Sequence, residues 1–198
     1  MKITPGGVIE ALRAGTPAVL PFDTVYGLAA VPSETAVRRL YALKGREEHR
    51  PTALVAGSLE RLLAELPELP TAAHALLPGP VTLVVSNPAH RFAWLTGTNR
   101  DAIGVRVPEL TGPTAQILAE VGAVAATSAN RPGGPNPMRL ADVPEEIRSG
   151  SVLVDGGELP GTPSTVVDLT EEEPRILREG ALPGEEALAR LAAAVRSK

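Results

Sequence analysis

The chain has 198 residues, of which 43% are hydrophobic, a net charge of −4 and no cysteine. This composition excludes a largely disordered chain, disulfides, thiolate metal sites and cysteine nucleophiles. The acidic balance and the small number of aromatic residues argue against a general nucleic-acid coat. No apolar run reaches the roughly 18 residues of a membrane-spanning helix, and no export signal is visible. We therefore expect one domain over residues 1–198, in a soluble cytoplasmic protein without membrane contact.

The first half of the chain predicts helices that alternate with strands. Thr4 and Pro5 are residue types that open a helix, and Gly15 is one that closes it. Ser33 and Gly45 bracket a second helix in the same way. The other elements predicted here are strands at 18–20, 52–56, 81–85 and 103–107 and a helix from 58 to 66.

The second half continues the alternation, with one long interruption. The stretch 131–137 is rich in proline and glycine and predicts a loop. The predicted elements around it are helices at 111–121, 144–148 and 185–196 and strands at 123–126, 152–154, 165–167 and 176–177. The whole pattern predicts an α/β fold with a mixed sheet.

Lys44 is the only lysine away from the two ends of the chain, against sixteen arginines. It is separated from Arg46 by Gly45 alone. A mobile ammonium beside a planar guanidinium suits a polyanion such as a triphosphate. The alternative is a helix C-terminus, where cations favour the dipole and glycine adopts the left-handed cap. Both interpretations can hold at once.

Polar residues near the ends of predicted strands are further candidates, because ligands of open α/β sheets collect there. Asp23 and Thr24 follow the first strand, although they could be ordinary turn residues. Arg106 lies in a β-branched strand, where it either pairs with an anion or faces outward. Ser128 and Asn130 lie in a run of small residues that either admits a ligand or caps a helix. Other polar segments are 163–168, 177–180 and 78–82, the last of which we interpret as purely structural.

Standard catalytic and nucleotide-binding motifs are missing from the sequence. It has no Gly-x-x-x-x-Gly-Lys-Ser/Thr, no Gly-x-Gly-x-x-Gly, and no hydrolase elbow around Ser128 or Ser164. The three histidines, His49, His74 and His90, are too scattered to predict a metal site. The residues by themselves therefore predict a pocket with excess positive charge, several hydroxyls and small-residue walls, which binds a small anionic ligand.

Taken in order, seven runs of the sequence resemble the threonylcarbamoyl-AMP synthase family, which has a YrdC-like fold. The runs are Asp23-Thr24-Val25-Tyr26-Gly27-Leu28, Lys44-Gly45-Arg46, Pro78-Gly79-Pro80-x-Thr82, Gly104-Val105-Arg106-x-Pro108, Thr127-Ser128-Ala129-Asn130, Ser164-Thr165-Val166-Val167-Asp168 and Leu177-Arg178-x-Gly180. The resemblance implies the short, single-domain form of the family. It also implies a twisted mixed β-sheet with flanking helices that encloses a concave basic cavity.

The same resemblance implies an enzyme, a nucleotidyltransferase that makes threonylcarbamoyl-AMP and pyrophosphate from L-threonine, bicarbonate and ATP. The product serves the N6-threonylcarbamoyladenosine modification at position 37 of tRNA. Its implied partners are a downstream threonylcarbamoyl-transferase complex and tRNA or another RNA. Mg²⁺ is expected to arrive with ATP, held by phosphates and water, so no protein ligand set is expected.

The resemblance further implies roles for individual residues. The predicted catalytic residues are Lys44 and Arg46. The predicted ATP-binding residues are Arg46, Arg50, Ser128, Asn130, Asn136 and Arg178. The predicted threonine-binding residues are Thr24, Arg106, Ala126 and Ser164. Arg106 suits the carboxylate of threonine because a guanidinium can donate two parallel hydrogen bonds to it.

Three positions depart from the pattern of the family. Phe22 replaces a threonine, Thr52 replaces a leucine, and Pro132 replaces a serine beside Asn130. Two other functions stay open at this point. One is a double-stranded RNA-binding or ribosome-maturation module of the same fold, against which the acidic net charge argues. The other is a carbamoyl-transfer domain of the hydrogenase-maturation type, which normally accompanies zinc-finger segments that this sequence lacks.

Overall fold

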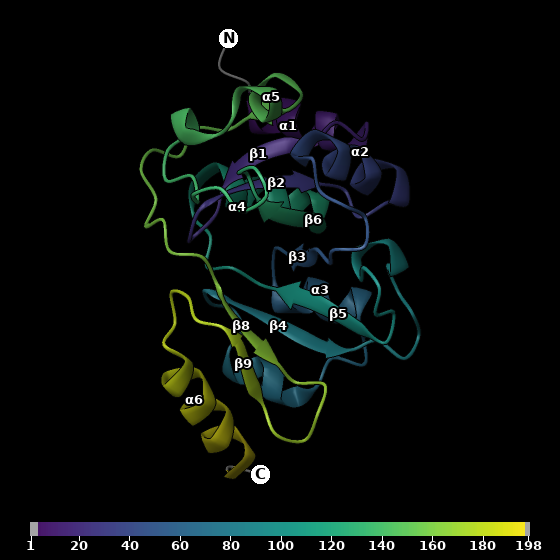
Figure 1. Cartoon of the computed structure of the whole chain (residues 1–198), viewed down its shortest axis with the longest axis vertical. Coiled ribbons are helices and arrows are strands. Elements are labelled where there is room, and N and C mark those ends of the chain that lie inside the picture. Colours follow the sequence, from purple (N-terminus) through teal and green to yellow (C-terminus); the bar gives the residue numbers. More distant parts are fainter. Residues whose placement is uncertain (1–3, 197–198) are drawn as a thin grey trace.

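The computed structural model describes residues 4–196, and within that range nine strands form a single mixed sheet. The strands are β1 (Ala18–Pro21), β2 (Tyr26–Ala30), β3 (Ala53–Ala56), β4 (Val81–Ser86), β5 (Ala102–Arg106), β6 (Ala123–Ser128), β7 (Val152–Leu153), β8 (Thr165–Asp168) and β9 (Arg175–Arg178). Their order in the sheet is β7-β1-β2-β6-β3-β5-β4-β8-β9. The pairs β1–β7, β3–β5 and β4–β8 are parallel and the other neighbours are antiparallel. The sheet therefore extends along the long axis of the molecule (Figure 1).

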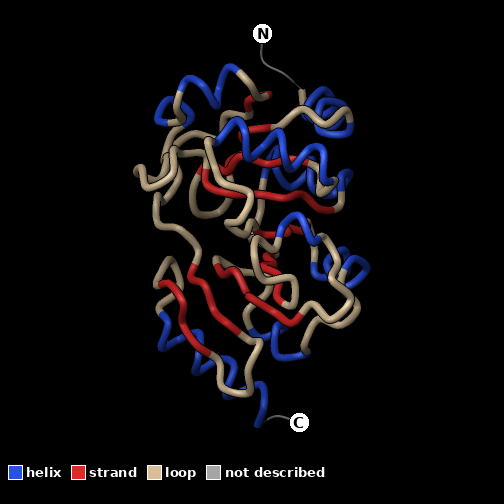
Figure 2. The backbone as a smooth tube through the Cα atoms, turned by 45° about the vertical axis from the view of Figure 1, so that its right-hand side comes forward, coloured by secondary structure: helices blue, strands red, loops and turns tan. Residues whose placement is uncertain are grey.

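Helices flank this sheet on both sides (Figure 2). They are α1 (Pro5–Arg13), α2 (Glu34–Lys44), α3 (Leu59–Glu65), α4 (Gly112–Val121), α5 (Glu145–Ser149) and α6 (Gly184–Arg196), with 3₁₀ turns η1 (Thr71–Ala75), η2 (Ala93–Leu95) and η3 (Leu140–Asp142). The side chains of Thr4, Ser33 and Ser58 each accept a hydrogen bond from a backbone N–H of the first turn that follows. In the described part of the chain, no helix has the length and apolar character needed to cross a bilayer.

Side chains that alternate along the strands create one hydrophobic core on each face of the sheet. Val19 and Leu28 pack in the larger core, which includes residues of α2, α3, α5 and α6. Leu20 and Ala29, the next residues along, pack on the opposite face with residues of α1 and α4. On that second face, α1 contacts β1 and β7, and α4 contacts β6. Val84 and Val166, farther along the same face, stay partly exposed, so this part of the sheet is open to a ligand.

The mixed sheet with flanking helices confirms the predicted fold class, and the predicted helices and the loop at 131–137 are confirmed too. The main omission is β2, for which no strand was predicted. It is a central strand that pairs with both β1 and β6. All five of its residues are buried, so it lacks the polar–apolar alternation by which a half-exposed strand is recognised. Its pairing also extends β6 to Ser128, two residues past the predicted end.

Gly45 ends α2 in the left-handed region, with a φ of 64°, as predicted. A Cβ at this position would meet no atom within 4 Å, so Gly45→Ala adds backbone strain without a clash. We expect this variant to lose about 1 kcal/mol of unfolding free energy in urea titrations. Gly45→Asn should lose less, because asparagine tolerates the left-handed region better. Equal stability of all three proteins would contradict this account of the cap.

Candidate active site

A cavity of about 240 Å³ opens on the face of the sheet opposite the larger core. Its lining residues come from seven strands, β2, β3, β4, β5, β6, β8 and β9, and from the loops that adjoin them. Arg178 is the last residue of β9, and the loop residues are Phe22, Thr24, Val25, Arg46, Pro51, Thr52, Asn136, Pro163 and Ser164. Gly27, Ala53 and Ala126 are small, so they leave room over the middle of the sheet. The cavity thus borders the smaller core, with which it shares Phe22, Val55 and Ala126.

Most of the predicted site residues lie around this one cavity. Eight of the eleven line it, namely Thr24, Arg46, Arg106, Ala126, Ser128, Asn136, Ser164 and Arg178. Lys44 and Asn130 are buried next to the lining residue Ser128, to which both are hydrogen-bonded. Arg50 is exposed outside the lining, with its Nε 3.7 Å from a carboxylate oxygen of Glu47. The structure thus brings ten of the predicted residues together and leaves Arg50 at the surface.

The Lys44 ammonium is 4% exposed and donates to three oxygens of one short segment. These are the backbone oxygens of Ser128 at 2.5 Å and Asn130 at 2.8 Å and the Asn130 side-chain oxygen at 2.9 Å. Burial, together with the nearby Arg46 charge, lowers the pKa of Lys44 to about 8. Asn130 in turn donates from its amide nitrogen to the Gly134 oxygen at 2.6 Å. Lys44 therefore connects the end of α2 to the end of β6 and, through Asn130, to the loop that carries Asn136.

Arg46 lies two residues beyond Lys44 and reaches the lining of the cavity. One terminal nitrogen, Nη2, donates to the Pro51 backbone oxygen at 2.6 Å. Its Nε is buried and has no hydrogen-bond partner among the described residues. Burial is also the largest cause that lowers the pKa of this guanidinium. A buried, partnerless N–H is costly, so it favours a ligand oxygen at this point.

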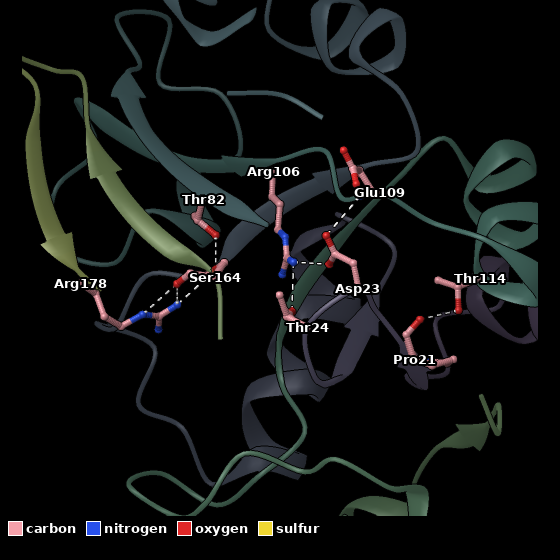
Figure 3. Close-up of polar contacts among 9 residues, drawn as sticks. All are labelled: Pro21, Asp23, Thr24, Thr82, Arg106, Glu109, Thr114, Ser164 and Arg178. Atoms are coloured by element: carbon pink, nitrogen blue, oxygen red, sulfur yellow. Dashed lines mark hydrogen bonds and ion pairs between the residues drawn. The ribbon is translucent and has the colours of Figure 1, made fainter. Parts of the chain in front are cut away.

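Arg106 also lines the cavity, and residues of the turn between β1 and β2 hold it (Figure 3). Its Nη2 donates to the Asp23 carboxylate and, at 3.0 Å, to the Thr24 hydroxyl. The second Asp23 oxygen accepts the Glu109 backbone N–H at 3.2 Å. Burial raises the pKa of Asp23 and lowers that of Arg106, while their mutual attraction opposes both shifts. Arg106 also keeps a buried Nε without a partner among the described residues.

Ser164 and Arg178 form a third polar group of the lining, which Figure 3 places beside Thr82. Arg178 donates from Nη2 to the Ser164 backbone oxygen at 2.5 Å and to its hydroxyl at 3.1 Å. The Ser164 hydroxyl also lies 2.8 Å from that of Thr82. The hydroxyl positions at this end of the cavity are therefore set by protein hydrogen bonds.

Sequence reasoning missed part of this arrangement. Thr82 lies in the segment that we interpreted as purely structural, yet it lines the cavity. Its signal was the alternation of β4, which places Thr82 and Val84 on the face opposite Val81 and Leu83. Asp23 was a candidate with an ordinary turn residue as the alternative and was given no role in the site, yet it carries the ion pair to Arg106.

Two departures from the family pattern, Phe22 and Thr52, also belong to the lining. The ring of Phe22 packs so close to Gly27 that a Cβ there would come within 2.5 Å of it. Phe22 therefore fills space at the edge of the cavity, where the family pattern has a smaller, hydroxyl-bearing residue. The third departure, Pro132, is exposed in the loop beside Asn130.

The sheet and the cavity together define an α/β protein with a polar ligand pocket on the uncovered part of a mixed sheet. A family model named Sua5_yciO_yrdC, with the description "Telomere recombination", matches residues 10–180. The chain belongs to this Sua5/YciO/YrdC family.

Named relatives agree with this assignment. The chain is 37% identical to a threonylcarbamoyl-AMP synthase of Pyrococcus abyssi, over 88% of this chain and 53% of that protein. It is 33% identical to a threonylcarbamoyl-AMP synthase of Chromohalobacter salexigens, over 83% of this chain and 92% of that protein. The crystal structure of P. abyssi Sua5 complexed with L-threonine superimposes with a TM-score of 0.83 and 35% identity, over 96% of this chain and 58% of that one. The chain therefore spans about half the length of the archaeal relative and nearly all of the bacterial one.

The lowered pKa of Lys44 predicts a measurable pH dependence of stability. The unfolded chain keeps its proton up to the ordinary lysine pKa of about 10.4. The folded protein loses it near 8, so between these values the unfolded state binds more protons. The contribution of Lys44 to the unfolding free energy should therefore rise with pH across this window. Lys44→Met should remove this rise, which urea titrations of both proteins from pH 7 to 10 will measure. If the unfolding free energies of the two proteins changed in parallel with pH, the assigned pKa would be contradicted.

Proposed function

We propose that this protein makes threonylcarbamoyl-AMP and pyrophosphate from L-threonine, bicarbonate and ATP. The observation that carries the proposal is the single cavity that combines Arg46, Arg106 and Arg178 with several hydroxyls and without a carboxylate among its lining residues. The names of the two relatives and the threonine complex of P. abyssi Sua5 support the same activity.

The chemistry of this reaction matches the donors of the cavity. The amine of threonine captures CO₂ from bicarbonate as a carbamate, and a carbamate oxygen then attacks the α-phosphorus of ATP. The bond from that phosphorus to the β-phosphate oxygen breaks, and pyrophosphate leaves. Such a transfer needs positioned reactants and donors aimed at the developing negative charge. The guanidinium groups of Arg46 and Arg106, which line the cavity, supply donors for this charge.

Different groups of lining residues suit different parts of the ligands. Arg46 and Ser128 lie next to Lys44, and there we place the phosphates and the nucleotide, with Asn136. Thr24 is hydrogen-bonded to Arg106, and there we place threonine, with its carboxylate on Arg106 and with Ser164 as a further contact. The guanidinium of Arg106 is already paired with the carboxylate of Asp23. The carboxylate of threonine would therefore bind the guanidinium nitrogens that Asp23 leaves available.

Mg²⁺ belongs to this proposal as a companion of ATP. Among residues 4–196, no group of three or more His, Cys, Asp or Glu is arranged to hold a metal ion. In our proposal phosphate oxygens and water coordinate the ion, which would neutralise phosphate charge. The proposal also includes a cytoplasmic location, transfer of the product by a threonylcarbamoyl-transferase complex, and contact with the tRNA substrate of that transfer.

The direct test is pyrophosphate release from the purified protein. We expect release only when ATP, L-threonine and bicarbonate are all present, together with Mg²⁺. Mass spectrometry should find threonylcarbamoyl-AMP in equal amount. Release that does not depend on threonine would indicate an ATP pyrophosphatase and would contradict the proposal.

Arg46→Ala and Lys44→Ala test the placement of the phosphates. Arg46→Ala removes a charge from the lining, and Lys44→Ala removes the three bonds that hold the Ser128–Asn130 segment. Each should lower kcat/KM for ATP at least tenfold, or about 1.4 kcal/mol of transition-state stabilisation. Arg38→Ala is the matched control, because Arg38 forms an exposed ion pair with Glu34 on the same helix. Circular dichroism checks the fold, and parent-like rates in Arg46→Ala would refute this placement.

A further inference from the structure

Asp23 is a buried carboxylate with no place in the reaction described so far. Its side chain is 12% exposed and that of Arg106 is 10% exposed, so their ion pair is nearly removed from water. Asp23 does not line the cavity, whereas its neighbours Phe22 and Thr24 do. In Figure 3 it lies on the side of Arg106 that faces away from the lining residues Thr82, Ser164 and Arg178.

The two oxygens of Asp23 connect three separate segments of the chain. One accepts a hydrogen bond from Arg106 at the end of β5, and the other accepts the backbone N–H of Glu109 beyond that strand. Asp23 itself lies in the turn between β1 and β2. The carboxylate of Asp23 thus holds the guanidinium of Arg106 through a single nitrogen, Nη2, which also donates to the Thr24 hydroxyl. The Nε of the same guanidinium is left without a protein partner.

We propose that Asp23 is the positioning residue that orients Arg106 toward the carboxylate of the amino-acid substrate. The inference rests on the proposed function, and it adds a residue that determines how that substrate is bound. A guanidinium that lacks this anchor could rotate about its side chain and would present fewer aligned donors to an incoming carboxylate. A charge-assisted hydrogen bond is shorter and about twice as strong as a neutral one, so an uncharged substitute restrains the guanidinium less.

Asp23→Asn is the main variant, because it keeps the shape and removes the charge. We expect it to raise the KM for threonine at least tenfold, with the KM for ATP and kcat changed less than threefold. A merely structural role would move the two KM values together. Asp168→Asn is the matched control, since Asp168 is also a largely buried aspartate paired with an arginine, Arg175, outside the cavity lining. It should leave both KM values within twofold of the parent.

Two further measurements complete the test. In an Arg106→Gln background, Asp23→Asn should change the threonine KM less than twofold, because the group through which it acts is gone. Asp23→Glu, which shifts the charge by one methylene, should raise the threonine KM at least threefold. This variant replaces Asp23→Asn in the test if Asp23→Asn does not fold. An unchanged threonine KM in the folded variants, or equal rises for threonine and ATP, would overturn the inference.

Calorimetric binding of threonine separates this inference from the proposed function. If the parent protein binds threonine and makes the adenylate, and the Asp23 variants bind threonine as tightly as the parent, only the role of Asp23 is overturned. A parent protein that neither binds threonine nor releases pyrophosphate would overturn both.

Discussion

The site depends on the need of buried cations for oxygen partners. A charge removed from water is costly unless hydrogen bonds replace its hydration. Lys44 meets this need with oxygens of Ser128 and Asn130, and Arg106 meets it with Asp23. Each of these contacts joins segments more than 80 residues apart in the chain. The hydrogen bonds that offset the cost of burying these cations therefore also bring together the segments that form the cavity.

The sheet supplies the other condition for a site, which is an uncovered surface. The larger core lies under the whole length of the sheet, whereas the cluster that includes α1 and α4 on the opposite face has no residue of β4, β5, β8 or β9. The remaining part of that face presents Thr82, Ala53 and Val166 beside the arginines. Because these residues sit on hydrogen-bonded strands, the positions of their side chains are well defined. Asn136 comes from a loop, which Asn130 restrains through the Gly134 oxygen.

Local signals in the sequence were sufficient for most elements. Helix caps such as Ser33 and Gly45 work through contacts within a few residues, so they are readable without tertiary structure. The strand β2 was missed because a strand buried on both faces carries no alternation, and its pairing with β1 and β6 is decided at long range. The order of short motifs predicted the family and most of the cavity lining, although no single motif was specific.

The sequence by itself determined the family, the fold class and the set of cations and hydroxyls from which a site is made, because residue type and local spacing carry that information. Tertiary structure alone decided which of them meet and in what role. It placed Lys44 under the lining as a buried connector, left Arg50 at the surface, and paired Asp23 with Arg106. The physical reason is that a side chain's partners and its exposure are set by strand order and by which helices cover each face, and these depend on contacts between distant parts of the chain.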